Sequence, residues 1–170
     1  MKKLLIPLLI VLFVGKILGQ SEYSSSVINI GVVVSDLDSS MDFYQNILGM
    51  IKVNLYDITP EMGSKTGLSD GIPFKAEVLK VEDSPNATEW KLMSFGDEAQ
   101  HPKQKWIHDD TGMQYITLMV KSLAPFLERL KQNKIPLLGE TPTPLSETLS
   151  LVLIQDPDGN FIELIGPLGN

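Results

Sequence analysis

The chain has 170 residues, 43% of them hydrophobic, and a formal net charge of -7. This length and content fit one folded domain with a short extension. The acidic balance argues against nucleic acids and anionic membrane surfaces as partners, because both favour a basic patch. With no cysteine and only two histidines, the chain can form no disulfide, thiolate site, cysteine nucleophile or three-histidine metal site.

Residues 1–19 have the pattern of an export signal. Two lysines precede an almost unbroken apolar run from Leu4 to Gly15, and small and polar residues follow. The run is shorter than the roughly 20 residues needed to span a bilayer. We therefore predict a cleaved signal peptide and a secreted or periplasmic protein, with residues 20–26 as a polar lead-in. An uncleaved membrane anchor is the alternative.

Residues 27–95 are predicted to form a first structural unit. The segment Val27–Val34 is rich in β-branched residues, which favours a strand. A helix follows from about Ser39 to Leu48 and ends at a glycine. Further strands are predicted over residues 50–56, 74–81 and 89–95, with a polar loop over residues 57–73.

Residues 96–112 form the predicted linker, which holds both histidines. His101 and His108 are predicted to be surface imidazoles, because nothing at ligand spacing accompanies them. A metal cluster of His108 with the two aspartates that follow it is the alternative. Trp106 is predicted to be a packing anchor for the linker, or else to line the mouth of a cleft.

Residues 113–168 are predicted to form a second unit. A strand over residues 113–120 leads to a helix with Ser122 as its cap and an apolar stripe at helical spacing. The stripe consists of Leu123, Phe126, Leu127 and Leu130. A strand over residues 135–140, a loop over residues 141–147 and a β-hairpin over residues 151–165 complete the unit.

The hairpin carries one anomalous residue, Glu163. It lies between Ile162 and Leu164 in a run too apolar to be a solvated face. Strand side chains alternate between faces, so Glu163 points away from its two neighbours. If both faces are covered, its carboxylate needs a partner: a metal ion, a protein cation or water.

The two units match when the first is shifted by 86 positions. The shift pairs Val34 with Val120, Leu37 with Leu123, Met41 with Leu127 and Tyr44 with Leu130. We therefore predict one α+β domain over residues 27–168, built from two tandem βαβββ modules whose curved sheets pair and enclose a cleft. Clefts on such a pseudo-twofold axis are common ligand sites.

Two motifs carry a resemblance to a known family. The first is Val32-Val33-Val34-Ser35-Asp36-Leu37 with Phe43-Tyr44 and Leu48-Gly49-Met50, and the second is Asp156-Pro157-Asp158-Gly159-Asn160 followed by Ile162-Glu163-Leu164. Together they resemble the vicinal oxygen chelate superfamily, which includes glyoxalase I, bleomycin and fosfomycin resistance proteins, extradiol dioxygenases and methylmalonyl-CoA epimerase. The resemblance covers about residues 27–167.

The resemblance implies one divalent metal held by side chains from four strands. The glutamate of the closing hairpin matches Glu163, and the other ligand positions fall on Asn29, Lys91 and Tyr115. The chain thus departs from the pattern at three of four positions, and a lysine cation does not share a site with a divalent ion. We expect no metal cofactor. The alternative is one divalent ion that uses Glu89, two residues from Lys91 on the same strand face.

The leading hypothesis is a binding protein. An ion pair of Lys91 with Glu163 would replace the metal, and Asn29 and Tyr115 would complete a polar cluster for a small polar or anionic molecule. The cluster also suits proton abstraction next to a carbonyl, with Glu163 as general base and Tyr115 or Lys91 as acid.

Three further expectations complete the hypotheses. A metal-dependent lyase, isomerase or dioxygenase acting through Glu163 is the alternative activity. A third hypothesis, from another functional class, is an interaction module in which the duplicated sheets serve only as a scaffold. The expected partner is a small molecule, with no nucleic acid and no membrane contact beyond export; the resemblance also allows a homodimer with sites shared between chains.

Overall fold

The computed structural model describes residues 22–96, 102 and 104–169. The predicted signal peptide and His101 lie outside these residues. Within the described ranges, no helix is both long enough and apolar enough to cross a membrane.

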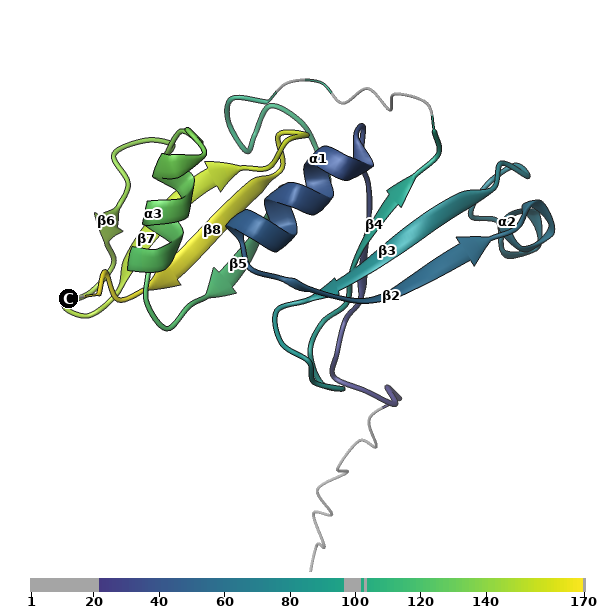
Figure 1. Cartoon of the computed structure of the whole chain (residues 1–170), viewed down its shortest axis with the longest axis horizontal. Helices are drawn as coiled ribbons and strands as arrows, with labels where there is room; N and C mark the ends of the chain where they lie inside the picture. The colour runs from purple at the N-terminus through teal and green to yellow at the C-terminus, as the bar shows by residue number, and fades with distance from the viewer. Residues whose placement is uncertain (1–21, 97–101, 103, 170) are drawn as a thin grey trace, which may run out of the picture.

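The strands form two four-stranded sheets (Figure 1). The first sheet has the order β1 (Ile30–Val33), β4 (Trp90–Ser94), β3 (Phe74–Lys80) and β2 (Ile51–Ile58). The second has the order β5 (Tyr115–Met119), β8 (Phe161–Gly166), β7 (Ser150–Gln155) and β6 (Thr143–Pro144). In each sheet the first strand runs parallel to its neighbour and the other pairs are antiparallel. The predicted α+β architecture of two paired modules is confirmed.

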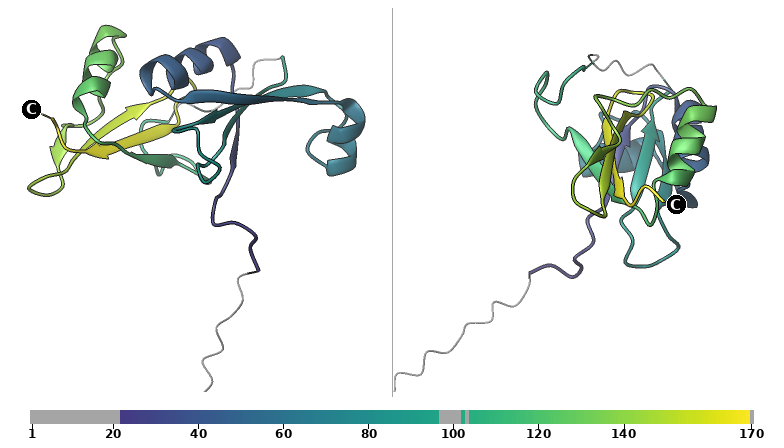
Figure 2. Two further views of the ribbon diagram at one scale, coloured as in Figure 1. Left: turned by 60° about the horizontal axis from the view of Figure 1, so that its bottom comes forward. Right: turned by 90° about the vertical axis from the view of Figure 1, so that its left-hand side faces the viewer.

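Helices cover one side of both sheets (Figure 2). Helix α1 (Leu37–Asp42) continues into the π-helical segment η1 (Phe43–Ile47), and α3 (Ala124–Gln132) occupies the matching place in the second unit. Asp36 caps α1, because its carboxylate accepts a hydrogen bond of 3.0 Å from the Ser39 N–H. The apolar stripe predicted for α3 is confirmed: Leu123 and Leu130 are fully buried in the core.

Along β5 and from Ile162 to Ile165 on β8, more buried and more exposed side chains alternate between the two faces of the sheet. On β8, Ile162 and Leu164 are fully buried against the helices, whereas Glu163 is only partly buried on the opposite face. On β5, Tyr115 and Met119 are exposed on that same opposite face. The uncovered face of both sheets therefore holds the candidate site residues.

Two predictions for the loops are wrong. The segment 57–73 contains the end of β2 and the helix α2 (Pro60–Thr66), which Thr59 caps with a 3.2 Å hydrogen bond from the Met62 N–H. A proline in the first helical turn is itself a helix signal, but the polar composition concealed it. The segment 135–140 forms no strand; the two-residue strand β6 lies in the predicted loop that follows.

Ser122 does not cap α3 as predicted. The residue at the cap position is Leu123, which makes no side-chain capping bond. The Ser122 hydroxyl oxygen instead accepts a hydrogen bond of 3.3 Å from the N–H of Ala124, the first residue of the helix. The helix begins later than the serine suggested, because its first turn contains Pro125.

Strands β2 and β3 extend beyond the rest of the first sheet and carry α2 at their far end (Figure 1). Nearly every residue of β2 is exposed, so neither of its faces is covered. The large exposed apolar side chains of β2 are Ile51, Val53, Leu55 and Tyr56. A two-stranded ribbon with so little covered apolar surface is only marginally stable by itself.

The two units are joined by polar contacts as well as by a shared apolar core. The Tyr44 hydroxyl donates a hydrogen bond of 2.8 Å to Asp156 in the turn of the β7–β8 hairpin, and both side chains are buried. The Ser35 N–H and hydroxyl both donate to Asp158 in the same turn. From α3, Arg129 donates to the Ile47 carbonyl at 2.6 Å. Each contact ties the first unit to the second.

Candidate functional site

On the second sheet, Glu163 is held by a neighbouring hydroxyl. In the register of the sheet, Glu163 lies between Thr117 on β5 and Leu153 on β7. The Thr117 hydroxyl donates a hydrogen bond of 2.6 Å to Glu163 Oε2. Tyr115 lies two positions earlier on β5, on the same face, and is 51% exposed. This half of the site is therefore an oriented carboxylate with a phenol beside it, open to solvent.

On the first sheet, Lys91 pairs with Glu89 of its own strand region. The distance from Lys91 Nζ to Glu89 Oε2 is 3.1 Å. Lys91 Nζ also lies 5.4 Å from the centre of the Tyr56 ring, within the range of a cation–π contact. On the other side, Lys80 Nζ lies 3.9 Å from Glu89 Oε1. Glu89 is thus flanked by two ammonium groups.

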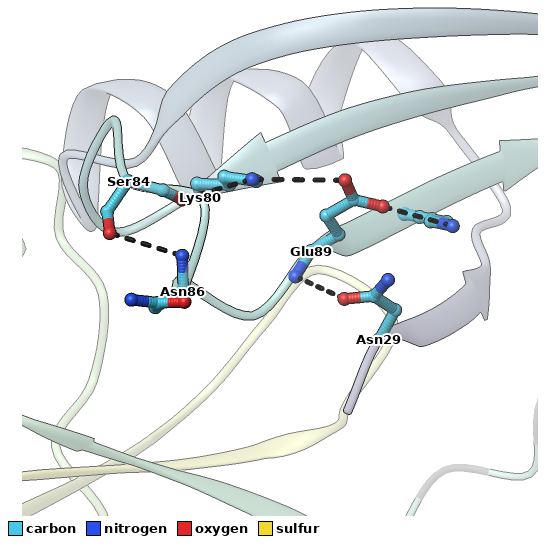
Figure 3. Close-up of polar contacts among 6 residues, drawn as sticks. Asn29, Lys80, Ser84, Asn86 and Glu89 are labelled. Carbon is cyan, nitrogen blue, oxygen red and sulfur yellow. Dashed lines mark hydrogen bonds and ion pairs between the residues drawn. The ribbon is translucent and has the colours of Figure 1, made fainter. Parts of the chain in front are cut away.

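Asn29 belongs to this same cluster. Its side-chain oxygen accepts a hydrogen bond of 3.0 Å from the main-chain N–H of Glu89 (Figure 3). This bond fixes the start of β4 against the residue that precedes β1. Asn29 therefore uses its acceptor to position the Glu89 main chain, and its amide nitrogen remains available to the exposed surface.

Lys91 and Glu163 occupy corresponding positions in the two sheets. Lys91 pairs in register with Gly31 on β1, and Glu163 pairs in the same way with Thr117 on β5. Gly31 and Thr117 are themselves related by the 86-residue shift of the internal repeat. The first sheet therefore presents a cation where the second presents a carboxylate.

The predicted ion pair between Lys91 and Glu163 is wrong within one chain. Lys91 contacts Glu89 instead, and the hydrogen bond to Glu163 comes from Thr117. Glu89, the alternative second carboxylate for a metal at Glu163, instead lies between two lysines. The sequence placed Lys91 and Glu163 on equivalent strands, but which faces approach each other depends on how the two sheets are oriented.

These donors do not fit the divalent metal that the resemblance implies. Over the described ranges, no three histidine or acidic side chains lie close enough to hold an ion. The residue equivalent to Glu163 is Lys91. Its ammonium group repels a divalent cation and has no lone pair to donate while it is charged. The polar groups of this site are therefore not those of a divalent-metal centre.

The described part of the linker, residues 96, 102 and 104–112, shows no group of metal-ligating side chains. The His108 side chain is 80% exposed and lies 4.0 Å from Asp109. The Asp109 carboxylate accepts main-chain N–H bonds from Lys105 and Trp106, and the bond from Trp106 is the main reason that its pKa is lowered. Trp106 is 55% exposed, so it is not the packing anchor that we predicted.

The sequence analysis does not predict the buried hydrogen-bond network around Asp156. Its carboxylate accepts hydrogen bonds from the Asp158 N–H, the Asn160 N–H, the Asn160 side chain and the Tyr44 hydroxyl. Burial raises the pKa of Asp156 and, even more strongly, the pKa of Tyr44. A signal for this network is present in the sequence, because Tyr44 is a polar residue in an otherwise apolar helical stripe.

Comparison with known families assigns the fold and the two motifs. The family model for the Glyoxalase/Bleomycin resistance protein/Dioxygenase superfamily matches residues 26–164. The chain belongs to this superfamily. The predicted resemblance is thereby confirmed. Among curated proteins, no sequence matches.

Solved structures of the superfamily share the fold. A glyoxalase family protein from Bacillus cereus is 19% identical with a TM-score of 0.71, over 88% of this chain and 99% of that chain. The trypanothione-dependent glyoxalase I of Leishmania major is 21% identical with a TM-score of 0.61, over 84% and 87%. A fosfomycin resistance protein from Listeria monocytogenes, in complex with Mn(II) and a dihydroxypropylphosphonic acid, is 17% identical with a TM-score of 0.54, over 86% and 94%.

Proposed function

We propose that this superfamily member binds a small polar or anionic molecule on the uncovered faces of its sheets and needs no divalent metal to do so. The observation that carries the proposal is Lys91, an ammonium group at the position that corresponds to Glu163. The cluster of Lys91, Glu89 and Lys80 has a net charge of +1, because it contains two ammonium groups and one carboxylate. Such a group attracts an anionic ligand and disfavours a metal ion.

The groups on the second sheet suit hydrogen bonding to the same ligand. Thr117 holds Glu163 in one orientation, and a preorganised acceptor costs less entropy on binding than a free side chain. The exposed phenol of Tyr115 supplies a donor next to it. We further propose that the protein acts outside the cytoplasm, after removal of the export signal over residues 1–19.

We also propose that two copies of the chain form the complete site. The faces that carry Lys91 and Glu163 are uncovered within one chain, and large apolar side chains surround the polar groups. They are Val33, Tyr56, Tyr115 and Met119, each at least 40% exposed. An apolar surface of this kind marks an interaction site, and self-association through it would bring a first sheet opposite a second sheet.

The binding proposal is tested by ligand and metal titration of the mature protein. Small carboxylates and phosphonates are titrated by calorimetry, and the metal content is measured after purification without chelator. We expect Lys91→Met to weaken the bound anion by at least about tenfold, because it removes the cation that attracts the ligand. Glu163→Gln should weaken only ligands that also donate a hydrogen bond, because it replaces the carboxylate acceptor. Bound Mn, Zn or Ni at one ion per chain, lost in Glu163→Gln, would overturn the proposal.

Lys75→Met is the matched control for the charge change. Lys75 lies on β3 of the same sheet, but its side chain is 63% exposed and its contact with Asp57 is long, at 3.8 Å. A surface pair of this kind contributes little. Equal losses of affinity in Lys75→Met and Lys91→Met would show that only the overall charge matters.

The dimer is tested by sedimentation equilibrium. We expect a mass of twice one chain, where the full chain is 18.8 kDa. Met119→Glu should yield a monomer, because it places a charge in the apolar surface that the second copy covers. Leu145→Glu is the control, since Leu145 is equally apolar and 54% exposed but lies in the turn before β7. A monomeric wild-type protein contradicts the proposal.

A further inference from the structure

A second, separate pocket lies where the two sheets face each other through β1 and β5. Both are edge strands of their sheets, and a pocket of about 240 Å³ opens between them. Its walls come from residues 30–33 and 113–116, and its floor comes from Tyr44, Trp90 and Ile162. We call it the seam pocket. Of the polar groups of the proposed site, only Tyr115 borders it.

Two residues that line the seam pocket each have a buried polar atom without a hydrogen-bond partner in the described part of the chain. These atoms are the indole Nε1 of Trp90, a donor, and the side-chain oxygen Oε1 of Gln114, an acceptor. Trp90 is 7% exposed. Its N–H lies near enough to Tyr44 to lower the pKa of that hydroxyl, yet it makes no regular hydrogen bond. A buried donor or acceptor without a partner destabilises the folded chain, so a ligand that pairs with both is favoured.

The edge of β1 offers further polar groups to the pocket. The N–H groups of Ile30 and Val34 donate to main-chain oxygens on the β4 side. Since main-chain groups alternate in direction along a strand, those of Gly31 and Val33 point away from β4, toward the pocket. No charged side chain borders the pocket, so its ligand should be uncharged.

We propose that the seam pocket binds a small, flat, uncharged molecule in which a hydrogen-bond acceptor stands beside an N–H donor, such as an aromatic amide or lactam. The carbonyl oxygen would accept from the Trp90 indole, and the amide N–H would donate to Gln114. The aromatic rings of Tyr44, Trp90 and Phe161 give the ring of the ligand apolar contacts. Pairing both orphaned groups at once is what favours an amide over a hydrocarbon.

Benzamide is the probe, and proton–nitrogen NMR of the full mature protein is the measurement. The chain has two tryptophans, so the indole region contains two signals, and Trp106→Phe identifies the signal of Trp90. We expect benzamide to shift the Trp90 signal in a saturable way and to leave the Trp106 signal in place. Toluene should bind more weakly, because it pairs with neither orphaned atom.

Gln114→Met separates specific recognition from filling of space. Methionine keeps the length of the side chain but removes the amide oxygen. We expect benzamide to bind about fivefold more weakly to this variant, the loss of about one hydrogen bond. Acetophenone, which accepts from the indole but offers no N–H, should bind wild type and variant equally, which also verifies that the pocket is intact.

Two results would overturn the seam-pocket proposal. One is the absence of any shift of the Trp90 signal up to the solubility limit of benzamide. The other is equal affinity for benzamide and toluene. Glu163→Gln should leave benzamide binding unchanged, so this test and the test of the anion site succeed or fail independently.

Discussion

Replacing Asp156 by alanine should lower the free energy of unfolding by about 3 kcal/mol. The carboxylate is 6% exposed and accepts four hydrogen bonds, from Tyr44, Asp158 and Asn160. Truncation leaves the buried Tyr44 hydroxyl without a partner and removes the bonds that shape the hairpin turn. Each such loss costs about 1–3 kcal/mol and the losses are not additive. Urea denaturation followed by circular dichroism measures the change.

Tyr44→Phe is the companion variant, since it removes only the hydroxyl. It should cost less than Asp156→Ala, and the double variant should cost clearly less than the sum, because the two side chains share one hydrogen bond. Additive losses would mean that the bond between the units contributes nothing measurable. A loss below about 1 kcal/mol for Asp156→Ala itself would contradict the buried network.

The same carboxyl makes a prediction about pH. Burial raises the pKa of Asp156 above the ordinary aspartate value of 3.8. The folded protein therefore retains the proton at pH values at which the unfolded chain has lost it. It follows that this group's contribution to the free energy of unfolding falls as the pH rises from 3.8 through the folded pKa. Relative to Asp156→Asn, which does not titrate, wild type should lose stability over that interval.

Gly166→Ala should cost about 3 kcal/mol or more, through a steric clash. Gly166 ends β8 and is buried. A Cβ atom there would overlap the main-chain carbonyl oxygen of Val120 and lie 2.8 Å from Val120 Cγ2. Main chain cannot move aside as a flexible side chain can, so β8 and the end of β5 would have to separate. Overpacking in a core typically costs about 1–3 kcal/mol, and a main-chain clash belongs at or above the upper end.

Gly31→Ala is the matched control for that prediction. Gly31 also lies on a strand, but an added Cβ would meet the terminal methyl of Met93 at 3.0 Å, the far end of a flexible side chain. We expect a loss below about 1 kcal/mol, because the methionine can rotate away. Equal melting temperatures for Gly166→Ala and Gly31→Ala would refute the steric argument.

The sequence predicted the two-module fold because two independent signals agreed. The 86-residue repeat placed β1 and β5 at corresponding positions, and the register around Gly31 and Thr117 follows that correspondence. Strand alternation also placed Glu163 on the face opposite Ile162, as the burial of the two residues confirms. Local periodicity carries this information, because it depends only on neighbours along the chain.

Partners across the sheet and between sheets could not be predicted in the same way. Lys91 and Glu89 share a face by alternation, but the sequence does not say whether a lysine pairs within its strand or across a cleft. The contact of Tyr44 with Asp156 joins residues 112 positions apart, and no local pattern encodes it. The short helix after Thr59 is concealed by its polar composition, which is typical of a loop. The threonine and the proline that follows it nevertheless form a helix start signal.

The contacts between the two units also set the order in which the molecule can fold. Ser35 and Tyr44 reach their partners only after more than a hundred further residues have been synthesised. Until the hairpin exists, the first helix has no acceptor for its buried hydroxyl, so a stable first unit should not accumulate during synthesis. Closing such long loops is slow, which predicts folding in one late step. Residues 22–96 expressed alone should therefore remain largely unfolded.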